Sequence, residues 1–157
     1  MVMTEDEDSV DAVEEAAGLR VAIVRIQRQL RAHSGSDITP SQSSALARIE
    51  HDGPVRLGAL AELEGTTAAT MSRVIDSLSV RRLIQRIPDP LDGRASLVQL
   101  SPEGGALLHG LRAGYTEALR GALAQLNAGE RRVVRQSIPV LARLSDLLQS
   151  SDGDEVD

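Results

Sequence analysis

The chain has 157 residues and contains no cysteine, phenylalanine or tryptophan, so disulfides, thiolate metal sites and aromatic base-stacking platforms are excluded. Its formal net charge is -6, but seven of the 23 acids lie within residues 1–15 and four within residues 150–157. Residues 16–149 therefore hold 12 acids against all 17 basic residues, every one an arginine, and carry about +5. A basic middle segment keeps a nucleic-acid partner open despite the acidic total.

The acidic segments 1–11 and 150–157 are predicted to be disordered tails. The N-terminus lacks a basic segment followed by an apolar stretch, and no apolar run approaches membrane-spanning length. We therefore expect a cytoplasmic protein with no membrane partner. The three histidines are not spaced like a metal pair, and neither a phosphate-cradling glycine loop nor a nucleophile motif is found. No metal, cofactor or enzymatic activity is expected.

Residues 12–34 are predicted to form a helix, because apolar side chains recur there every three or four positions. Thr39 is a strong start signal for a second helix. Pro40 follows in the first turn, and Gln42 completes a capping box with Thr39. This helix is expected to end near Gly53.

Two further helices are predicted at about 56–63 and 67–81, joined by a tight turn at Gly65. A small residue, Ala61, four positions before this glycine lets the two helices cross closely, as in a helix-turn-helix. The same pattern is compatible with any αα-corner. On the longer helix, four residues share an apolar core face and four point away from it: Met71, Val74, Ile75 and Leu78 against Ala69, Ser72, Arg73 and Asp76.

Strands are predicted at 84–87 and 96–100, on either side of a turn that contains Asp92 and Arg94. A hairpin directly after a helix-turn-helix is typical of a winged helix, whose second helix enters the major groove of DNA. An arginine at the hairpin tip then has a role, because a narrow minor groove attracts it. Asp92 is placed to hold either that guanidinium or the turn.

A long helix is predicted from residue 101 to about 126 and a last helix to about 149, with a kink near Pro139. The long helix contains five glycines, which require an explanation. The expected fold is mainly α with a small β-hairpin. A winged helix-turn-helix at 35–100 would lie between an N-terminal dimerisation helix at 12–34 and C-terminal dimerisation helices at 101–149.

Residues 92–104, DGRASLVQLSPEG, resemble the wing motif of the multiple antibiotic resistance regulator (MarR) family, which is Asp-x-Arg, a strand, then Leu-Ser/Thr-x-x-Gly. Residues 60–86 are similar to the recognition segment of that family, and residues 38–49 resemble its second helix. The likeness covers roughly residues 19–149. Glu64 departs from a usually apolar position. Arg82 replaces a usual glycine, so it is expected to be left-handed or to contact phosphate.

The resemblance implies a homodimer that binds pseudo-palindromic promoter DNA, mostly as a repressor, and that in many cases releases it when a small ligand binds. Apolar stripes outside the winged helix independently require a partner. The residues expected in the dimer interface are Ile23, Ile26, Leu30, Val133, Val134, Ile138, Leu141, Leu144 and Leu148.

For DNA contact we expect Arg73 to take guanine bidentately and Arg94 to enter the minor groove. Ala69 can meet a thymine methyl group, and Arg86 is expected to hold Asp92 or a phosphate at the wing base. Arg56, Arg81 and Arg82 are weaker candidates. Hydrogen bonds to phosphates or base edges are expected from Thr67, Thr70 and Ser72.

A cleft between the dimer helices and the winged helix often receives anionic aromatic ligands in this family. Arg31, His33, Arg48 and His51 are candidates to supply its positive group. Two alternatives to a sequence-specific regulator remain open, namely a winged helix used for protein contact and a DNA-binding protein without sequence preference.

Overall fold

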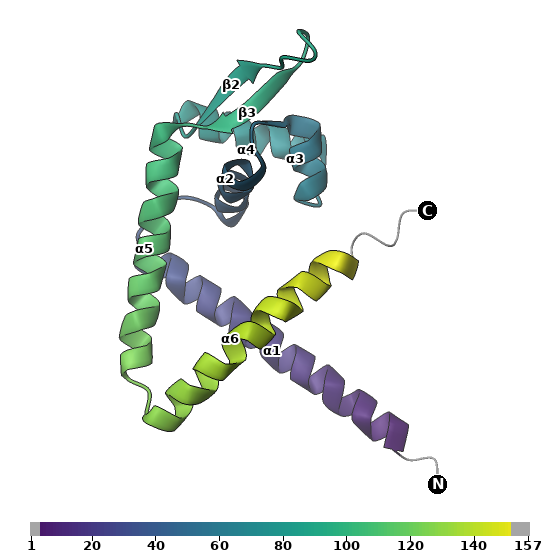
Figure 1. Cartoon of the computed structure of the whole chain (residues 1–157), viewed down its shortest axis with the longest axis vertical. Helices are drawn as coiled ribbons and strands as arrows, with labels where there is room; N and C mark the ends of the chain where they lie inside the picture. Colours follow the sequence, from purple (N-terminus) through teal and green to yellow (C-terminus); the bar gives the residue numbers. More distant parts are fainter. Residues whose placement is uncertain (1–3, 152–157) are drawn as a thin grey trace. The chain divides into compact units, whose positions relative to one another are not determined.

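The computed structural model describes residues 4–151, and they fold into six helices and three short strands. They divide into two compact units, one ending at Thr116 and one beginning at Glu117. In chain order the elements are α1 (Thr4–Ser34), α2 (Pro40–Asp52), β1 (Val55–Arg56), α3 (Leu57–Leu63), α4 (Ala68–Val80), β2 (Ile84–Pro88), β3 (Ser96–Leu100), α5 (Pro102–Ala124) and α6 (Ala128–Ser151) (Figure 1).

The first helix is longer than its apolar pattern indicates, because α1 begins at Thr4. Residues 4–11, which we expected to be disordered, are therefore helical. Residues 1–3 and 152–157 lie outside the described residues, and with them most of the predicted C-terminal tail.

The start of α2 follows the predicted capping box. The backbone N–H of Gln42 donates to Thr39 Oγ1 at 3.3 Å, and the backbone N–H of Thr39 donates to Gln42 Oε1 at 2.9 Å. Pro40 occupies the first turn, where its missing N–H costs nothing. Capping fixes where α2 begins and so which of its faces reaches the core.

Helices α3 and α4 form the predicted helix-turn-helix. The turn between them places Gly65 at φ +57°, a conformation that glycine adopts without a steric penalty. Thr67 caps α4 by accepting the backbone N–H of Thr70 at 3.2 Å. The core beneath is aliphatic, and its fully buried large side chains are Leu46, Leu60, Ile75, Leu78 and Val98. Each such side chain contributes about 1.5–3 kcal/mol by its removal from water.

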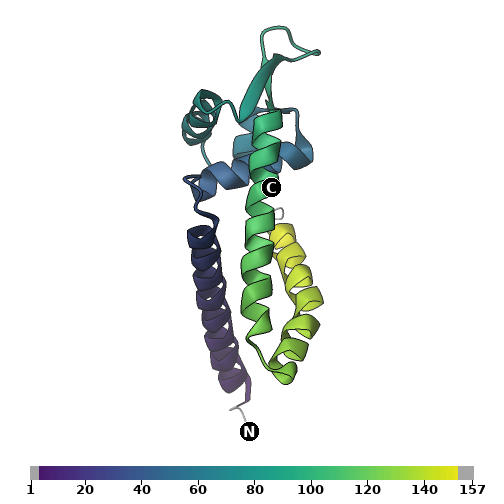
Figure 2. The ribbon, with the colours of Figure 1, turned by 90° about the vertical axis from the view of Figure 1, so that its left-hand side faces the viewer.

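The hairpin is part of a three-stranded antiparallel sheet with the order β1-β3-β2. β2 and β3 pair from Ile84 opposite Leu100 to Pro88 opposite Ser96. The third strand, β1, was not predicted, because two residues are too short to display an alternating pattern. Beyond the last pair of the ladder, the turn of the hairpin protrudes from the helical body (Figure 2). This hairpin is the wing.

The close approach of two backbones explains the first glycine of α5. A Cβ atom on Gly104 would lie 2.0 Å from the carbonyl oxygen of Leu83. Just before Leu83, Arg82 has φ 59°, which confirms the predicted left-handed conformation. The hydroxyl of Ser101 donates to the Arg82 carbonyl at 2.7 Å and accepts the Gly104 N–H at 2.9 Å. These contacts join α5 to the end of the helix-turn-helix.

In the second unit, α6 runs without interruption through Pro139. Asn127 and Glu130 cap it reciprocally, each backbone N–H donating to the other side chain at 2.9 Å. The kink expected near Pro139 stays a prediction. Among the described residues, no helix combines the length and apolar character needed to cross a membrane.

Candidate DNA-binding surface

The recognition helix α4 divides into a buried face and an exposed face. Met71, Ile75 and Leu78 are buried, whereas Thr67, Ala69, Thr70 and Arg73 are exposed and Ser72 is half-buried. The Thr67 hydroxyl donates to Thr70 Oγ1 at 2.9 Å, and the Ser72 hydroxyl lies 3.5 Å from Asp76 Oδ2. The hydroxyls thus have partners on the same helix. Arg73 makes no hydrogen bond or ion pair within the described chain, which leaves its guanidinium free for another molecule.

The wing tip is shaped by backbone contacts to Asp92. Its Oδ1 accepts the backbone N–H of Arg94 at 3.0 Å, and its carbonyl accepts the N–H of Ala95 at 2.9 Å. Asp92 therefore holds the turn and not the guanidinium, which decides between the two roles that the sequence leaves open. The Arg94 side chain is exposed, and no described residue pairs with its guanidinium. An arginine presented in this way can contact phosphate or the minor groove.

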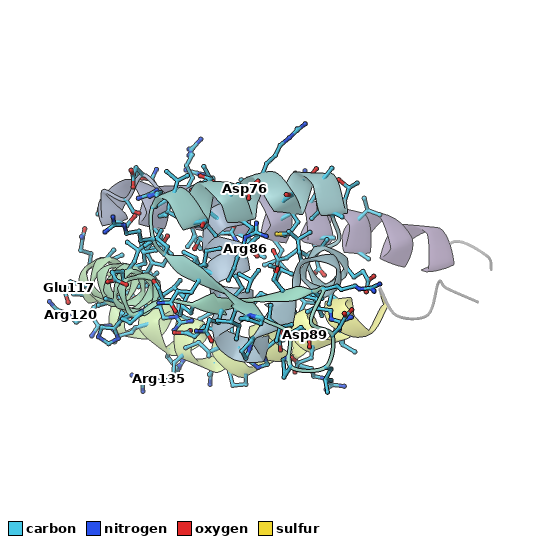
Figure 3. All side chains as sticks on the ribbon, turned by 90° about the horizontal axis from the view of Figure 1, so that it is seen from above. Asp76, Arg86, Asp89, Glu117, Arg120 and Arg135 are labelled. Atoms are coloured by element: carbon cyan, nitrogen blue, oxygen red, sulfur yellow. The ribbon has the colours of Figure 1, made fainter. Side chains whose placement is uncertain are left out.

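The base of the wing is linked to α4 by Arg86. Its Nη2 lies 2.9 Å from Asp76 Oδ1, and the two side chains approach each other from β2 and α4 (Figure 3). Arg86 was expected to hold either Asp92 or a phosphate, and the prediction of Asp92 is wrong. The reason is geometric, because Arg86 lies opposite Val98 within the ladder and not at the turn, while Asp76 is on the outward face of α4. Contact of Arg86 with a phosphate stays a prediction.

The sequence did not reveal a second ion pair, between Arg56 and Asp89. The Asp89 side chain is only 4% exposed, and Arg56 contacts its Oδ2 through Nε at 2.7 Å and Nη2 at 2.6 Å. Asp89 Oδ1 accepts the Leu91 N–H at 2.8 Å. The Leu91 N–H, and then Arg56, hold the pKa of Asp89 below its ordinary value against the opposing effect of burial. An aspartate before a proline suggests a turn, but the partner 33 positions away gives no sequence signal.

The four candidate ligand residues are not gathered at one site. Arg31 lines a cavity of about 370 Å³, together with Leu30, Ile38, Leu111 and Tyr115. The other three candidates do not line it.

These three candidates have local partners instead. His33 Nδ1 lies 2.9 Å from the Gln29 carbonyl. Arg48 lies 3.4 Å from Asp52 and 3.6 Å from Glu64. His51 contacts Asp52 at 2.6 Å, and this hydrogen bond is the main cause of the lowered pKa of Asp52. Arg48 is thus already paired with two carboxylates, which leaves its guanidinium less able to attract an anionic ligand.

Comparisons with known proteins agree with this geometry. The model of the MarR family matches residues 38–96. A helix-turn-helix transcriptional regulator of Mycobacterium tuberculosis is 37% identical over 132 residues, which cover 83% of this chain and 92% of the relative. The transcriptional repressor NicR of Pseudomonas putida is 31% identical over 94 residues, 60% of each chain.

A crystal structure of a transcriptional regulator from Pseudomonas aeruginosa superposes with a TM-score of 0.77 at 31% identity, covering 86% of this chain and 96% of that one. The matched family segment spans α2 to the wing, which contains every residue that we expect to contact DNA. The chain therefore belongs to the MarR family, and it is a winged-helix transcriptional regulator that binds DNA.

Proposed function

We propose that this regulator is a homodimeric repressor that reads pseudo-palindromic promoter DNA with α4 in the major groove and the wing in the minor groove. The observation that carries the proposal is the pair of free guanidinium groups on Arg73 and Arg94. Most other arginines of the winged helix have carboxylate partners, among them Arg48, Arg56 and Arg86. The two arginines left unpaired on α4 and the wing tip are those whose positions suit DNA.

Two different tasks are assigned to these arginines. Arg73 projects from the exposed face of α4, where a guanidinium can take guanine O6 and N7 bidentately. Arg94 is on a protruding turn, where it supplies positive charge to the minor groove. Thr67, Ala69 and Thr70 would add contacts at the N-terminus of α4. In this arrangement α4 provides the sequence preference, and the wing adds affinity.

Dimerisation is supported by apolar side chains that the single chain leaves in water. In α1, Ile23 and Ile26 are exposed, and Leu30 is half-buried. In α6, all six expected interface residues show the same mismatch between apolar character and exposure. Four are exposed and two are half-buried, namely Val133, Ile138, Leu141 and Leu148, and then Val134 and Leu144. We propose that α1, α5 and α6 form the dimer interface, which would present two α4 helices to successive turns of DNA, about 34 Å apart.

Repression and release by a ligand extend the proposal. The similarity to NicR, a repressor by name, supports the negative sign of regulation. The cavity beside Arg31 and Tyr115 supports a small anionic or aromatic effector, because it combines a guanidinium with the one tyrosine of the chain. Occupation of this cavity would favour a conformation with lower affinity for DNA.

The experiment that tests the proposal is hydroxyl-radical footprinting on the DNA upstream of the gene for this chain, combined with sedimentation of the complex. We expect two symmetric protected segments separated by about one helical turn and a mass of two chains per duplex. Protection of a single segment by one chain would contradict the dimer. Uniform protection without a preferred position would contradict the specific operator.

A further inference from the structure

We propose that Arg56 and Asp89 form a clamp that fixes the direction of the wing tip, so that both are positioning residues for Arg94. The proposal rests on the DNA-binding role of the wing given above and adds to it a device within the chain. The clamp consists of the Asp89 carboxylate, the Arg56 guanidinium and the Leu91 N–H.

The contacts of Asp89 close the turn from inside. Asp89 Oδ1 accepts the Leu91 N–H at 2.8 Å, and Oδ2 receives the guanidinium of Arg56. Its backbone N–H donates to the Ala95 carbonyl at 3.1 Å, and its carbonyl accepts the Asp92 N–H at 3.3 Å. The regular ladder has already ended at the pair Pro88 and Ser96. Residues 89–95 therefore take their path from these contacts together with those of Asp92 to the backbone N–H groups of Arg94 and Ala95.

Arg56 connects this turn to the helix-turn-helix. It is the last residue of β1 and the N-cap position of α3, so its backbone is fixed on two sides. Its guanidinium reaches Asp89 across β3, with which both β1 and β2 pair. The wing is thus attached to the body at two points outside the ladder, through Arg86 to α4 at its base and through Arg56 at its turn. A wing attached at its base alone could still bend at the turn.

Stability alone does not account for this pair. A buried carboxylate must give up water, and replacing a buried ion pair with apolar side chains is often neutral or stabilising. What the pair adds is a defined direction, because two nitrogens of the planar Arg56 guanidinium contact Oδ2 while Oδ1 accepts the Leu91 N–H. Arg94 lies five residues beyond Asp89 and has no side-chain partner within the described residues. If the turn is ordered before DNA arrives, less entropy is lost when Arg94 binds.

The test combines Arg56→Ala and Asp89→Asn with Arg94→Ala in double-mutant cycles. The probe is a duplex of the DNA upstream of the gene. Binding of each variant to it is measured at low salt by fluorescence anisotropy. Arg112→Ala is the matched control for Arg56→Ala. It removes an arginine from an ion pair outside the wing, with Glu50 at 2.5 Å, and changes the net charge by the same amount as Arg56→Ala. Thermal unfolding of each variant tests whether it remains folded.

We expect Arg56→Ala and Asp89→Asn each to weaken binding about tenfold, close to the effect of Arg94→Ala and equal to about 1.4 kcal/mol. In the Arg94→Ala background each substitution should change binding by less than about twofold, which is no more than the scatter seen between independent mutations. Full multiplication of the Arg56 and Arg94 effects would mean that Arg56 contacts DNA directly and would overturn the clamp.

Asp89→Asn distinguishes the clamp from an effect of charge alone, because the two predict opposite changes in DNA affinity. It removes a negative charge near DNA, so an effect of charge alone would strengthen binding. The clamp predicts weaker binding, and stronger binding would overturn it.

Hydrogen exchange without DNA separates the clamp from the proposed function. The amides of residues 91–95 should exchange faster in Arg56→Ala and Asp89→Asn than in the parent and in Arg112→Ala. Unchanged exchange would overturn the clamp even if the parent binds DNA. Faster exchange in a chain that does not bind the duplex would support the clamp and contradict the proposed function.

Discussion

The guanidinium of Arg86 and the carboxylate of Asp76 join the wing to the recognition helix, with Nη2 and Oδ1 2.9 Å apart. Their side chains are 41% and 63% exposed. An ion pair that is open to water contributes little to folding, because solvent screens it and two long side chains lose freedom. The ion pair instead acts on geometry, because it holds the base of the wing at a defined angle to α4, the helix that would read DNA.

Removal of the Arg86 side chain tests this view. Arg86→Ala should lower the free energy of unfolding by less than about 1 kcal/mol, measured by urea denaturation, because the pair is exposed. The free energy of DNA binding should fall by more than the free energy of unfolding, since both the wing angle and one positive charge are lost. A loss of folding stability well above this limit would contradict a mainly geometric role.

The two free arginines should give different binding phenotypes. Arg94→Ala should weaken binding to all duplexes and reduce the slope of log K against log salt by about one, because one phosphate or groove contact is lost. Arg73→Ala should also relax sequence preference, with a loss of about 1–3 kcal/mol on the preferred site. Titrations at several salt concentrations on preferred and scrambled duplexes measure both effects. Equal loss of preference in the two variants would contradict the division of tasks.

Two glycines of α5 should respond to alanine in opposite ways. Gly104→Ala would force a Cβ atom to 2.0 Å from the Leu83 backbone and should destabilise the winged helix. A Cβ on Gly110 would meet no atom within 4 Å in this chain. Gly110→Ala should therefore raise stability by up to about 1 kcal/mol, because alanine favours a helix interior. Thermal unfolding compares the two, and equal effects would contradict the close approach at Gly104.

The apolar face of α6 should hold the dimer. Ile138 is 60% exposed in the single chain, so Ile138→Asp should leave the fold intact but place a charge in the proposed interface. Sedimentation should show a shift from dimer to monomer. Gln136→Asp, an equal change of charge at an exposed polar position of the same helix, serves as the control. Dissociation by both variants, or by neither, would contradict the assignment of this face.

Low pH should protonate the carboxylate of Asp89 and so weaken its ion pair with Arg56. Its pKa is lowered from 3.8 in the folded chain, so its contribution to stability is present above that value and is lost as the pH falls through the folded pKa. The difference in unfolding midpoint between the parent and Asp89→Asn should therefore shrink as the pH falls below 3.8. Urea denaturation across a pH series measures it. A difference that grows towards acid would contradict the lowered pKa.

Much of the fold is readable from local sequence signals. The capping box at Thr39, the glycine turn before α4 and the positive φ of Arg82 each depend on neighbours within a few residues. Such signals depend on local hydrogen bonds and backbone sterics, which sequence displays directly. The winged helix could therefore be predicted as a unit.

The structural features that the sequence did not predict depend on contacts between residues far apart in the chain. β1 has two residues and exists because β3 pairs with it, and the partner of Asp89 is 33 positions away in sequence. Arg86 was assigned to the nearby Asp92, but its partner is on α4, because the ladder register carries it away from the turn. The expected ligand residues are a different case, because Arg48 and His51 each contact a near neighbour on the same helix, Asp52.

The most direct test of the central claim is fluorescence anisotropy of the purified chain on DNA from upstream of its own gene, against scrambled DNA of the same length, at two salt concentrations. A sequence-reading repressor predicts binding at least about a thousandfold tighter to the natural fragment, with a preference that persists at the higher salt. Equal and strongly salt-dependent binding to both fragments would contradict it.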